Sequence, residues 1–182
     1  MKIHFATIVA APVLALCFGI AHASFDMLLS VPGIAGESVV SGHGGETRIL
    51  SMNLGTLGET GRPTLQQLQR ANTPCVNRMM LTKLLDTTTA DFMTAALAGT
   101  LYTSVRLTVR QVAGSSFDLL VITLTNVKIA SSTLNGTEGV DPPTEMITLQ
   151  YQNAKGVFKY QTPQGQFLSK SFDTGTAGTC PF

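Results

Sequence analysis

Alternation of apolar and polar side chains recurs along this chain and constrains its fold more than any other feature. In the run Tyr102 to Val112, one face carries Val105, Leu107 and Val109, whereas the other carries arginine and threonine. A two-residue period of this kind is typical of a half-buried β-strand. Further strands are predicted at Phe25 to Val31, Thr47 to Leu54, Phe117 to Ile129, Glu145 to Tyr151, Val157 to Gln161 and Phe167 to Phe172. Short strands separated by turn residues favour a mainly β sandwich or barrel.

A single helix is expected between these strands. Thr88 or Thr89 is a candidate N-terminal cap, Asp91 lies in the first turn, and Gly99 is the expected stop. One apolar stripe, which we expect to pack on the core, contains Phe92, Met93, Ala96 and Leu97.

Two long connections are predicted to be irregular because they are rich in Gly, Ser, Thr, Asn and Pro. These are Gly55 to Pro74 and Ser131 to Pro143. The chain shows no internal repeat, so we expect residues 24–182 to form one domain with a flexible C-terminal tail from about residue 173.

The N-terminus has the features of an export signal. A short basic head precedes the apolar run Phe5 to Ala21, and the small residues Ala21 and Ala23 form the pattern that signal peptidase cleaves. Cleavage after Ala23 would leave Ser24 as the mature N-terminus. We therefore predict that residues 1–23 are a signal peptide and that the mature protein is secreted to the periplasm or beyond.

Two alternatives to cleavage stay open. A retained transmembrane anchor is disfavoured because the apolar run is shorter than the roughly 20 residues of a span and has no charged stop beyond it. Lipidation at Cys17 is disfavoured because Leu16 stands where that processing requires a small side chain. After cleavage we expect no stable membrane insertion.

Export also changes the meaning of the cysteines. Without Cys17, the remaining pair Cys75 and Cys180 lies in an oxidising compartment, where disulfides persist. An intramolecular bridge is predicted, and closing so long a loop contributes roughly 4–5 kcal/mol in the chain-entropy model. The alternatives are two separate thiols or a link to another subunit.

Charge and motif composition argue against nucleic-acid binding and against catalysis. The full chain has 12 basic and 11 acidic side chains, and removal of Lys2 with the signal peptide leaves them balanced, so no basic surface for phosphate is expected. His43 would be the one histidine left, which excludes a site built on two. The Gly42 to Gly45 segment lacks the lysine of a phosphate loop, and no GxSxG serine is present. We expect no enzyme activity, cofactor or metal.

The order of several segments resembles the haemolysin-coregulated protein (Hcp) family, the tube component of type VI secretion. The resemblance runs from about Met27 to about Gln164, and no single motif in it is specific, whereas the ordered set is. The matching segments are Gly36-Glu37-Ser38, Gly42-His43, Leu50-Ser51 with Gly55, Leu81 to Thr100, Arg106 to Gln111, Leu119 to Ser132, Thr144 to Tyr151 and Phe158 to Gly165.

The resemblance implies an Hcp-like β-barrel of two packed antiparallel sheets with one short flanking α-helix. It also implies homo-hexameric rings that stack into a tube whose lumen carries small effector proteins. The segment Ala35 to Glu46 matches the family's extended loop toward a neighbouring subunit, and its candidate residues are Gly36, Glu37, Ser38, Gly42, His43 and Glu46.

The signal peptide and the cysteine pair depart from the family pattern, because tube subunits of the family assemble in the cytoplasm. The alternative is therefore a monomeric secreted β-barrel binding module that retains the fold without tube assembly. A small secreted hydrolase is a third hypothesis, for which the sequence offers no motif.

Overall fold

The computed structural model describes residues 24–54, 78–112, 116–136, 138 and 142–174. The predicted signal peptide, the connection Gly55 to Pro74, the predicted pair Cys75 and Cys180 and the end of the C-terminal tail lie outside these ranges, and these features stay predictions.

Nine strands and one helix make up the described part of the chain. They are β1 (Phe25–Ser30), β2 (Thr47–Ile49), β3 (Ser51–Leu54), β4 (Arg78–Leu84), α1 (Thr89–Ala98), β5 (Leu101–Gln111), β6 (Phe117–Asn135), β7 (Thr144–Gln150), β8 (Asn153–Gln161) and β9 (Phe167–Asp173). All strand pairs are antiparallel.

The strands wrap into a barrel that closes through one short segment. Their order is β2-β1-β5-β6-β7-β4-β3, and β2 and β3 are separated only by Leu50. β2 pairs with β1, β3 pairs with β4, and the Leu50 N–H donates to the Thr82 carbonyl at 2.7 Å. The single strand predicted over Thr47 to Leu54 is thus two strands, because the segment changes partner at Leu50.

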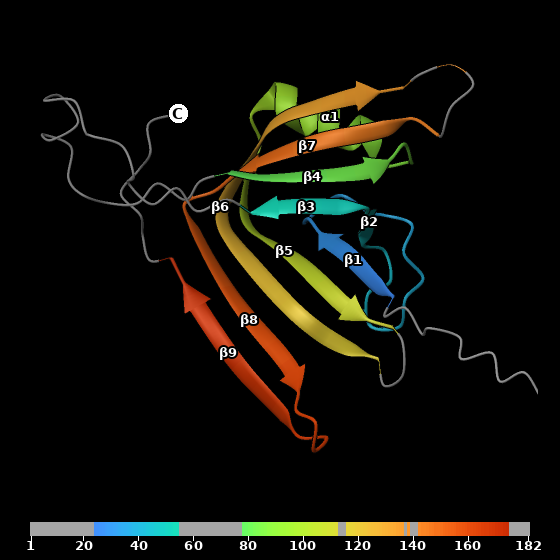
Figure 1. The fold of residues 1–182 in the computed structure, drawn as a ribbon. Helices are drawn as coiled ribbons and strands as arrows, with labels where there is room; N and C mark the ends of the chain where they lie inside the picture. The colour runs from blue at the N-terminus through green and yellow to red at the C-terminus, as the bar shows by residue number, and fades with distance from the viewer. Residues whose placement is uncertain (1–23, 55–77, 113–115, 137, 139–141, 175–182) are drawn as a thin grey trace, which may run out of the picture.

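The long strand β6 contributes to both layers of the barrel (Figure 1). Its first half pairs with β8 over Leu120 to Thr125, whereas its second half pairs with β7 over Lys128 to Asn135. Between the halves, Asn126 has a φ of 49°, a left-handed conformation that bends the strand. The expected barrel of two packed antiparallel sheets with one short helix is confirmed.

The core is built from the inward faces of these strands. The predicted inward face of β5 is confirmed, since Val105, Leu107 and Val109 are buried. From the opposite sheet, Leu81 and Ile147 are completely buried. Full burial of a side chain of this size contributes about 1.5–3 kcal/mol, so this interior dominates the stability of the barrel.

Helix α1 packs beside β6 by a narrower face than we predicted. Phe92 and Ala95 are buried and Ala96 packs partly against the core, but Met93 is 39% exposed and Leu97 is 90% exposed. The predicted stripe is wrong for Met93 and Leu97, because only one side of the helix contacts the barrel. Gly99 ends the helix with a φ of 62°, as expected.

The start of α1 differs from a standard capped helix. Thr88 occupies the cap position, but its hydroxyl makes no cap hydrogen bond and donates instead to Asp86 Oδ1 at 2.6 Å. The Thr89 hydroxyl accepts from the Asp86 N–H at 3.2 Å. The turn before the helix is therefore held by Asp86.

Two strands are longer than the alternation predicted. β6 continues to Asn135, so the expected irregular connection from Ser131 is wrong at its beginning, because β7 pairs with these Ser- and Thr-rich residues. β8 begins at Asn153 instead of Val157. Strand β4 was not predicted by the alternation, although its second half lies in the family-like segment Leu81 to Thr100.

Candidate functional site

The segment Gly36 to Glu46 forms a compact loop that closes on itself. The Gly36 N–H donates to the Gly45 carbonyl at 2.7 Å, Gly45 N–H donates to Ser38 O at 2.8 Å, and Ser38 N–H donates to Glu46 O at 3.0 Å. A Cβ at Gly36 would collide with the backbone of Glu46. Gly42 and Gly45 have φ values of 82° and 76°, so the turn requires their glycines.

His43 is the buried anchor of this loop. Its Nδ1 lies 3.0 Å from Glu46 Oε2 and its Nε2 lies 3.3 Å from Asp118 Oδ1, while only 6% of the residue is exposed. Asp118 is on β6, so the imidazole joins the loop to the barrel. A neutral imidazole has one N–H, and only the doubly protonated ring can donate to both carboxylates.

Two arginines on β5 complete the anchor. Arg106 donates to Glu46 Oε1 at 2.8 Å, and Arg110 lies 3.6 Å from Asp118 Oδ1. Arg110 also donates to the Ser41 carbonyl at 3.5 Å. The loop is therefore fixed to β5 through Arg106 and Arg110, and to β6 through Asp118.

The other side of the loop contacts the turn before α1. The Thr87 N–H donates to Glu37 Oε1 at 3.3 Å. Val39, between these anchors, is 93% exposed. The result is a firmly attached loop that presents one apolar side chain to its surroundings.

The structure thus gives each predicted loop residue a distinct place. His43 and Glu46 contact each other and are buried with Ser38, whereas Gly36 and Gly42 shape the backbone. Their predicted contact with a neighbouring subunit stays a prediction. The contributions of Asp118 and Arg106 were not foreseen.

A buried ion network between β4 and β7 was also missed. Lys83 Nζ lies 3.0 Å from Glu145 Oε2 and 2.7 Å from Asp86 Oδ1, and it donates to Thr89 Oγ1 at 3.1 Å. Lys83 shares the inward face of β4 with Leu81. A lysine in register with an inward leucine was therefore the sequence feature that could have indicated a buried ion pair. Burial raises the pKa of Asp86, but hydrogen bonds from Lys83 and Thr88 outweigh it and lower that pKa below its ordinary value.

A small hollow lies next to this network. Its volume is about 200 Å³, and its apolar lining comes from Leu50, Leu84 and Leu85. The charged residues at it are Glu37, Arg48 and Asp86. It therefore borders the base of the anchored loop.

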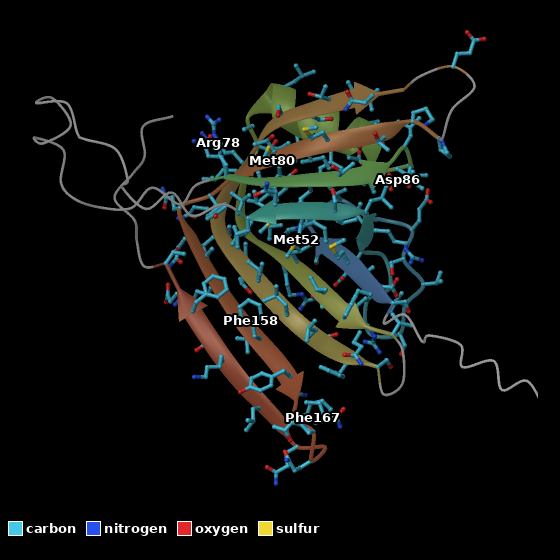
Figure 2. The ribbon with its side chains drawn as sticks, in the orientation of Figure 1. Met52, Arg78, Met80, Asp86, Phe158 and Phe167 are labelled. Atoms are coloured by element: carbon cyan, nitrogen blue, oxygen red, sulfur yellow. The ribbon has the colours of Figure 1, made fainter. Side chains whose placement is uncertain are left out.

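The β8–β9 hairpin forms a second surface, away from the hollow. Phe158, Tyr160 and Leu168 are each 40–44% exposed. Figure 2 shows Phe158 along this hairpin and Phe167 near its end, whereas Asp86 lies at the far end of β4. The hairpin and the hollow are therefore separate surfaces of the protein.

Among the described residues, no group of three or more His, Cys, Asp or Glu side chains could hold a metal ion. Within the same ranges, no helix is long and apolar enough to cross a membrane. The features that stand out are an anchored loop, a hollow and an exposed hairpin, all of which suit contacts between proteins.

Comparison with known families gives one family match. The family model described as "Type VI secretion system effector, Hcp" matches residues 28–158. Protein hcp1 of Pseudomonas aeruginosa is 28% identical over 141 residues, which cover 77% of this chain and 86% of that protein.

Solved structures share the fold at low sequence identity. One described as a type six secretion system protein has a TM-score of 0.68 at 22% identity, covering 82% of this chain and 92% of its own. Hcp1 from Salmonella typhimurium has a TM-score of 0.65 at 19% identity, covering 84% and 96%. These similarities support the barrel and helix described above.

Proposed function

Because the chain belongs to the Hcp family of secreted structural proteins of the type VI secretion system, we propose that it assembles into hexameric rings. In this proposal the rings stack into a tube, and small effector proteins travel in the central hole. The role is structural, without a catalytic step.

The anchored loop is the observation that carries this proposal. The contacts of His43 with Asp118 and of Glu46 with Arg106 fix the loop to the barrel, while Val39, earlier in the same loop, is 93% exposed. A loop already held in one conformation loses little entropy on binding a neighbour, so association costs less. We infer that Val39 inserts against the adjacent subunit.

The ring can be tested with the mature protein by light scattering and by electron microscopy. We expect particles of six subunits with a central hole. Val39→Asp should weaken assembly at least tenfold, because a buried contact would then contain a charge. The matched control is Leu97→Asp on the exposed side of α1, which should assemble normally.

A stable monomer at every concentration would contradict the ring and favour the alternative of a monomeric secreted binding module. Normal rings from Val39→Asp would exclude the loop from the interface. Circular dichroism of each variant separates loss of assembly from loss of folding.

Export and the disulfide form a separate part of the proposal. We propose cleavage after Ala23, secretion of the mature chain, and a bridge between Cys75 and Cys180. Intact mass of the secreted protein should correspond to a chain beginning at Ser24, with two hydrogens fewer before reduction than after it. A mass that includes residues 1–23, or unchanged by reduction, would contradict the respective part.

Effector carriage is tested by co-purification of small secreted proteins with assembled rings. A ring-defective variant such as Val39→Asp is the control, since a passenger held in the central hole should be lost with the ring.

A further inference from the structure

We propose that the β8–β9 hairpin of one subunit occupies the hollow of Leu50, Leu84 and Leu85 on a second copy of this chain. The inference rests on the proposed ring and identifies the two surfaces that join in it. It makes the contact head-to-tail, with a different surface on each partner.

The sheet face that points into the barrel continues along the β8–β9 hairpin, past the edge of the barrel. In β8, buried Ala154 alternates in register with Phe158 and Tyr160, so these three residues share a face. Phe158 pairs with buried Leu120 of β6, and Tyr160 pairs with Leu168 of β9. The same sheet face that is buried in the barrel is thus 40–44% exposed at Phe158, Tyr160 and Leu168.

The hollow has the size and lining for one such side chain. An apolar cavity of about 150 Å³ accepts a benzene ring, and this hollow has a volume of about 200 Å³. Its three leucines are 42–51% exposed, so an entering aromatic or leucine side chain would remove apolar surface from water on both partners.

Charge complementarity favours the hairpin of a second copy as the occupant. The two hairpin strands contain Lys155, Lys159 and Lys170 against a single acidic residue, Asp173. Lys155 is paired with Asp173 at 3.0 Å, and Lys159 lies on the opposite face, over the Phe167 ring, which leaves Lys170, the cross-strand partner of Phe158, as the net charge on the aromatic face.

The hollow has the opposite balance. Arg48 donates to Asp26 at 2.7 Å, and Lys83 lies 2.7 Å from Asp86, so each cation at the hollow already has an acidic partner. Glu37 adds a further carboxylate, which contacts the backbone N–H of Thr87. A hairpin face that carries Lys170 therefore suits a hollow with a surplus carboxylate.

The positions of the two surfaces make the contact intermolecular. Phe167 near the hairpin end and Asp86 beside the hollow lie far apart in Figure 2. One subunit therefore cannot fill its own hollow, and a contact between unlike surfaces closes a ring when its rotation permits. Since Glu37 belongs to the anchored loop, a hairpin in the hollow would also contact that loop.

Complementation between two variants tests the head-to-tail contact. Leu168→Asp disables the hairpin and Leu85→Asp disables the hollow; both side chains are about half exposed, at 44% and 49%. Each variant alone should assemble at least tenfold more weakly than wild type. An equal mixture should form a one-to-one dimer, because one intact hairpin meets one intact hollow. Leu97→Asp is the matched control and should assemble as wild type.

Native mass spectrometry distinguishes the outcomes. Wild-type assembly by Leu85→Asp, or a mixture that remains monomeric, would overturn the inference while rings of the wild type would still support the proposed function. The variants Leu168→Ser and Leu85→Ser repeat the test where an aspartate unfolds the chain, as monitored by circular dichroism.

Photo-cross-linking tests the same contact without requiring a stable ring. Tyr160→benzoylphenylalanine should cross-link to the peptide that contains Leu84 and Leu85. In a mixture of isotopically light and heavy protein, the cross-linked peptides should include light–heavy pairs, which show that the contact is between two copies. Such a cross-link in a protein that forms no rings would support the contact and contradict the proposed function. Rings without this cross-link would overturn the contact alone.

Discussion

Lys83 Nζ lies 3.0 Å from Glu145 Oε2, and neither side chain has any exposed surface. Oε2 accepts no well-aligned hydrogen bond among the described residues, so this contact is mainly electrostatic. Glu145 Oε1 accepts instead from the Ser132 hydroxyl at 2.6 Å. Because Lys83 and Glu145 are also cross-strand partners, the ion pair joins β4 to β7 inside the barrel.

Removing one member of this pair should be strongly destabilising. Lys83→Met leaves the Glu145 carboxylate buried without its cation, which typically costs about 3–5 kcal/mol in the free energy of unfolding. Lys83→Met combined with Glu145→Leu should recover part of that loss, since the fully buried carboxylate is removed together with its cation and only Asp86 still lacks its contact with Lys83. Urea unfolding of the singles and the double measures the coupling.

The exposed pair of Lys155 and Asp173 is the matched control. Its atoms also lie 3.0 Å apart, but the side chains are 61% and 48% exposed. Lys155→Met should cost at most about 1 kcal/mol, because water screens the pair. Equal losses of unfolding free energy in Lys83→Met and Lys155→Met would contradict the claim that burial makes the Lys83–Glu145 pair important.

Asp86 should make the stability of the barrel depend on acidity. Its pKa is raised by burial and lowered more strongly by Lys83 and Thr88, so in the folded state it lies below its ordinary value of 3.8. The unfolded chain therefore binds the proton more readily, and the stabilisation is present above pH 3.8 and lost as the pH falls below it. Urea unfolding across this range should show a smaller acid loss for Asp86→Asn. An unchanged slope in this variant would assign the acid loss to other groups.

The sequence predicted strands well where one face of a strand is buried, as in β5. It did not predict the change of partner at Leu50, because alternation records which face is buried and not which strand lies alongside. The exposed positions of Met93 and Leu97 were missed for a related reason, since an apolar stripe does not reveal how much of it the barrel covers. The strand pattern left a sandwich and a barrel open, and the family resemblance selected the barrel.

For the candidate site, local residues were easier to predict than distant ones. His43 and Glu46 lie three residues apart and were both singled out. Asp118 comes from a strand 75 residues away in the sequence, and only the folded barrel brings it to the imidazole. In the sequence, Lys83 is a single polar residue in a strand. Only the strand pairing of the fold shows that Glu145 lies opposite it.

Tyr151 should titrate only in strongly alkaline solution. Burial raises its pKa to about 12, and within the described ranges its hydroxyl has no hydrogen-bond partner. The folded state thus holds this proton more tightly, so its contribution to stability is present below the ordinary tyrosine pKa of about 10 and is lost as the pH rises through about 12. Absorbance at alkaline pH should lose this late transition in Tyr151→Phe. The substitution should cost less than about 1 kcal/mol, because it removes no hydrogen bond. A larger loss would reveal a partner of the hydroxyl.

The bend at Asn126 should tolerate glycine better than a branched residue. Its φ of 49° is left-handed, a conformation that costs most residues about 1–2 kcal/mol. Asn126→Val should therefore lower the free energy of unfolding by that amount or more, whereas Asn126→Gly should stay close to wild type. Thermal unfolding of both variants measures the difference. Equal stability of the two would show that the left-handed angle is not what holds the change of sheet in β6.

Close packing at Gly156 should be needed to hold the β8–β9 hairpin against the barrel. A Cβ there would collide with the ring of Phe172, its cross-strand partner in β9, while β6 pairs with Gly156 through Ile122 on the other side. Gly156→Ala should therefore destabilise the protein by about 1–3 kcal/mol, as overpacking does. Gly156→Ala with Phe172→Leu should regain part of the loss, because the smaller side chain leaves room for the methyl group.

Hydrogen exchange of the β9 amides in each variant locates the effect, and unchanged β9 protection in Gly156→Ala would contradict this role of the glycine. Loosening at β9 without global unfolding would also weaken the proposed contact with a second subunit, because that contact requires the hairpin to hold its position.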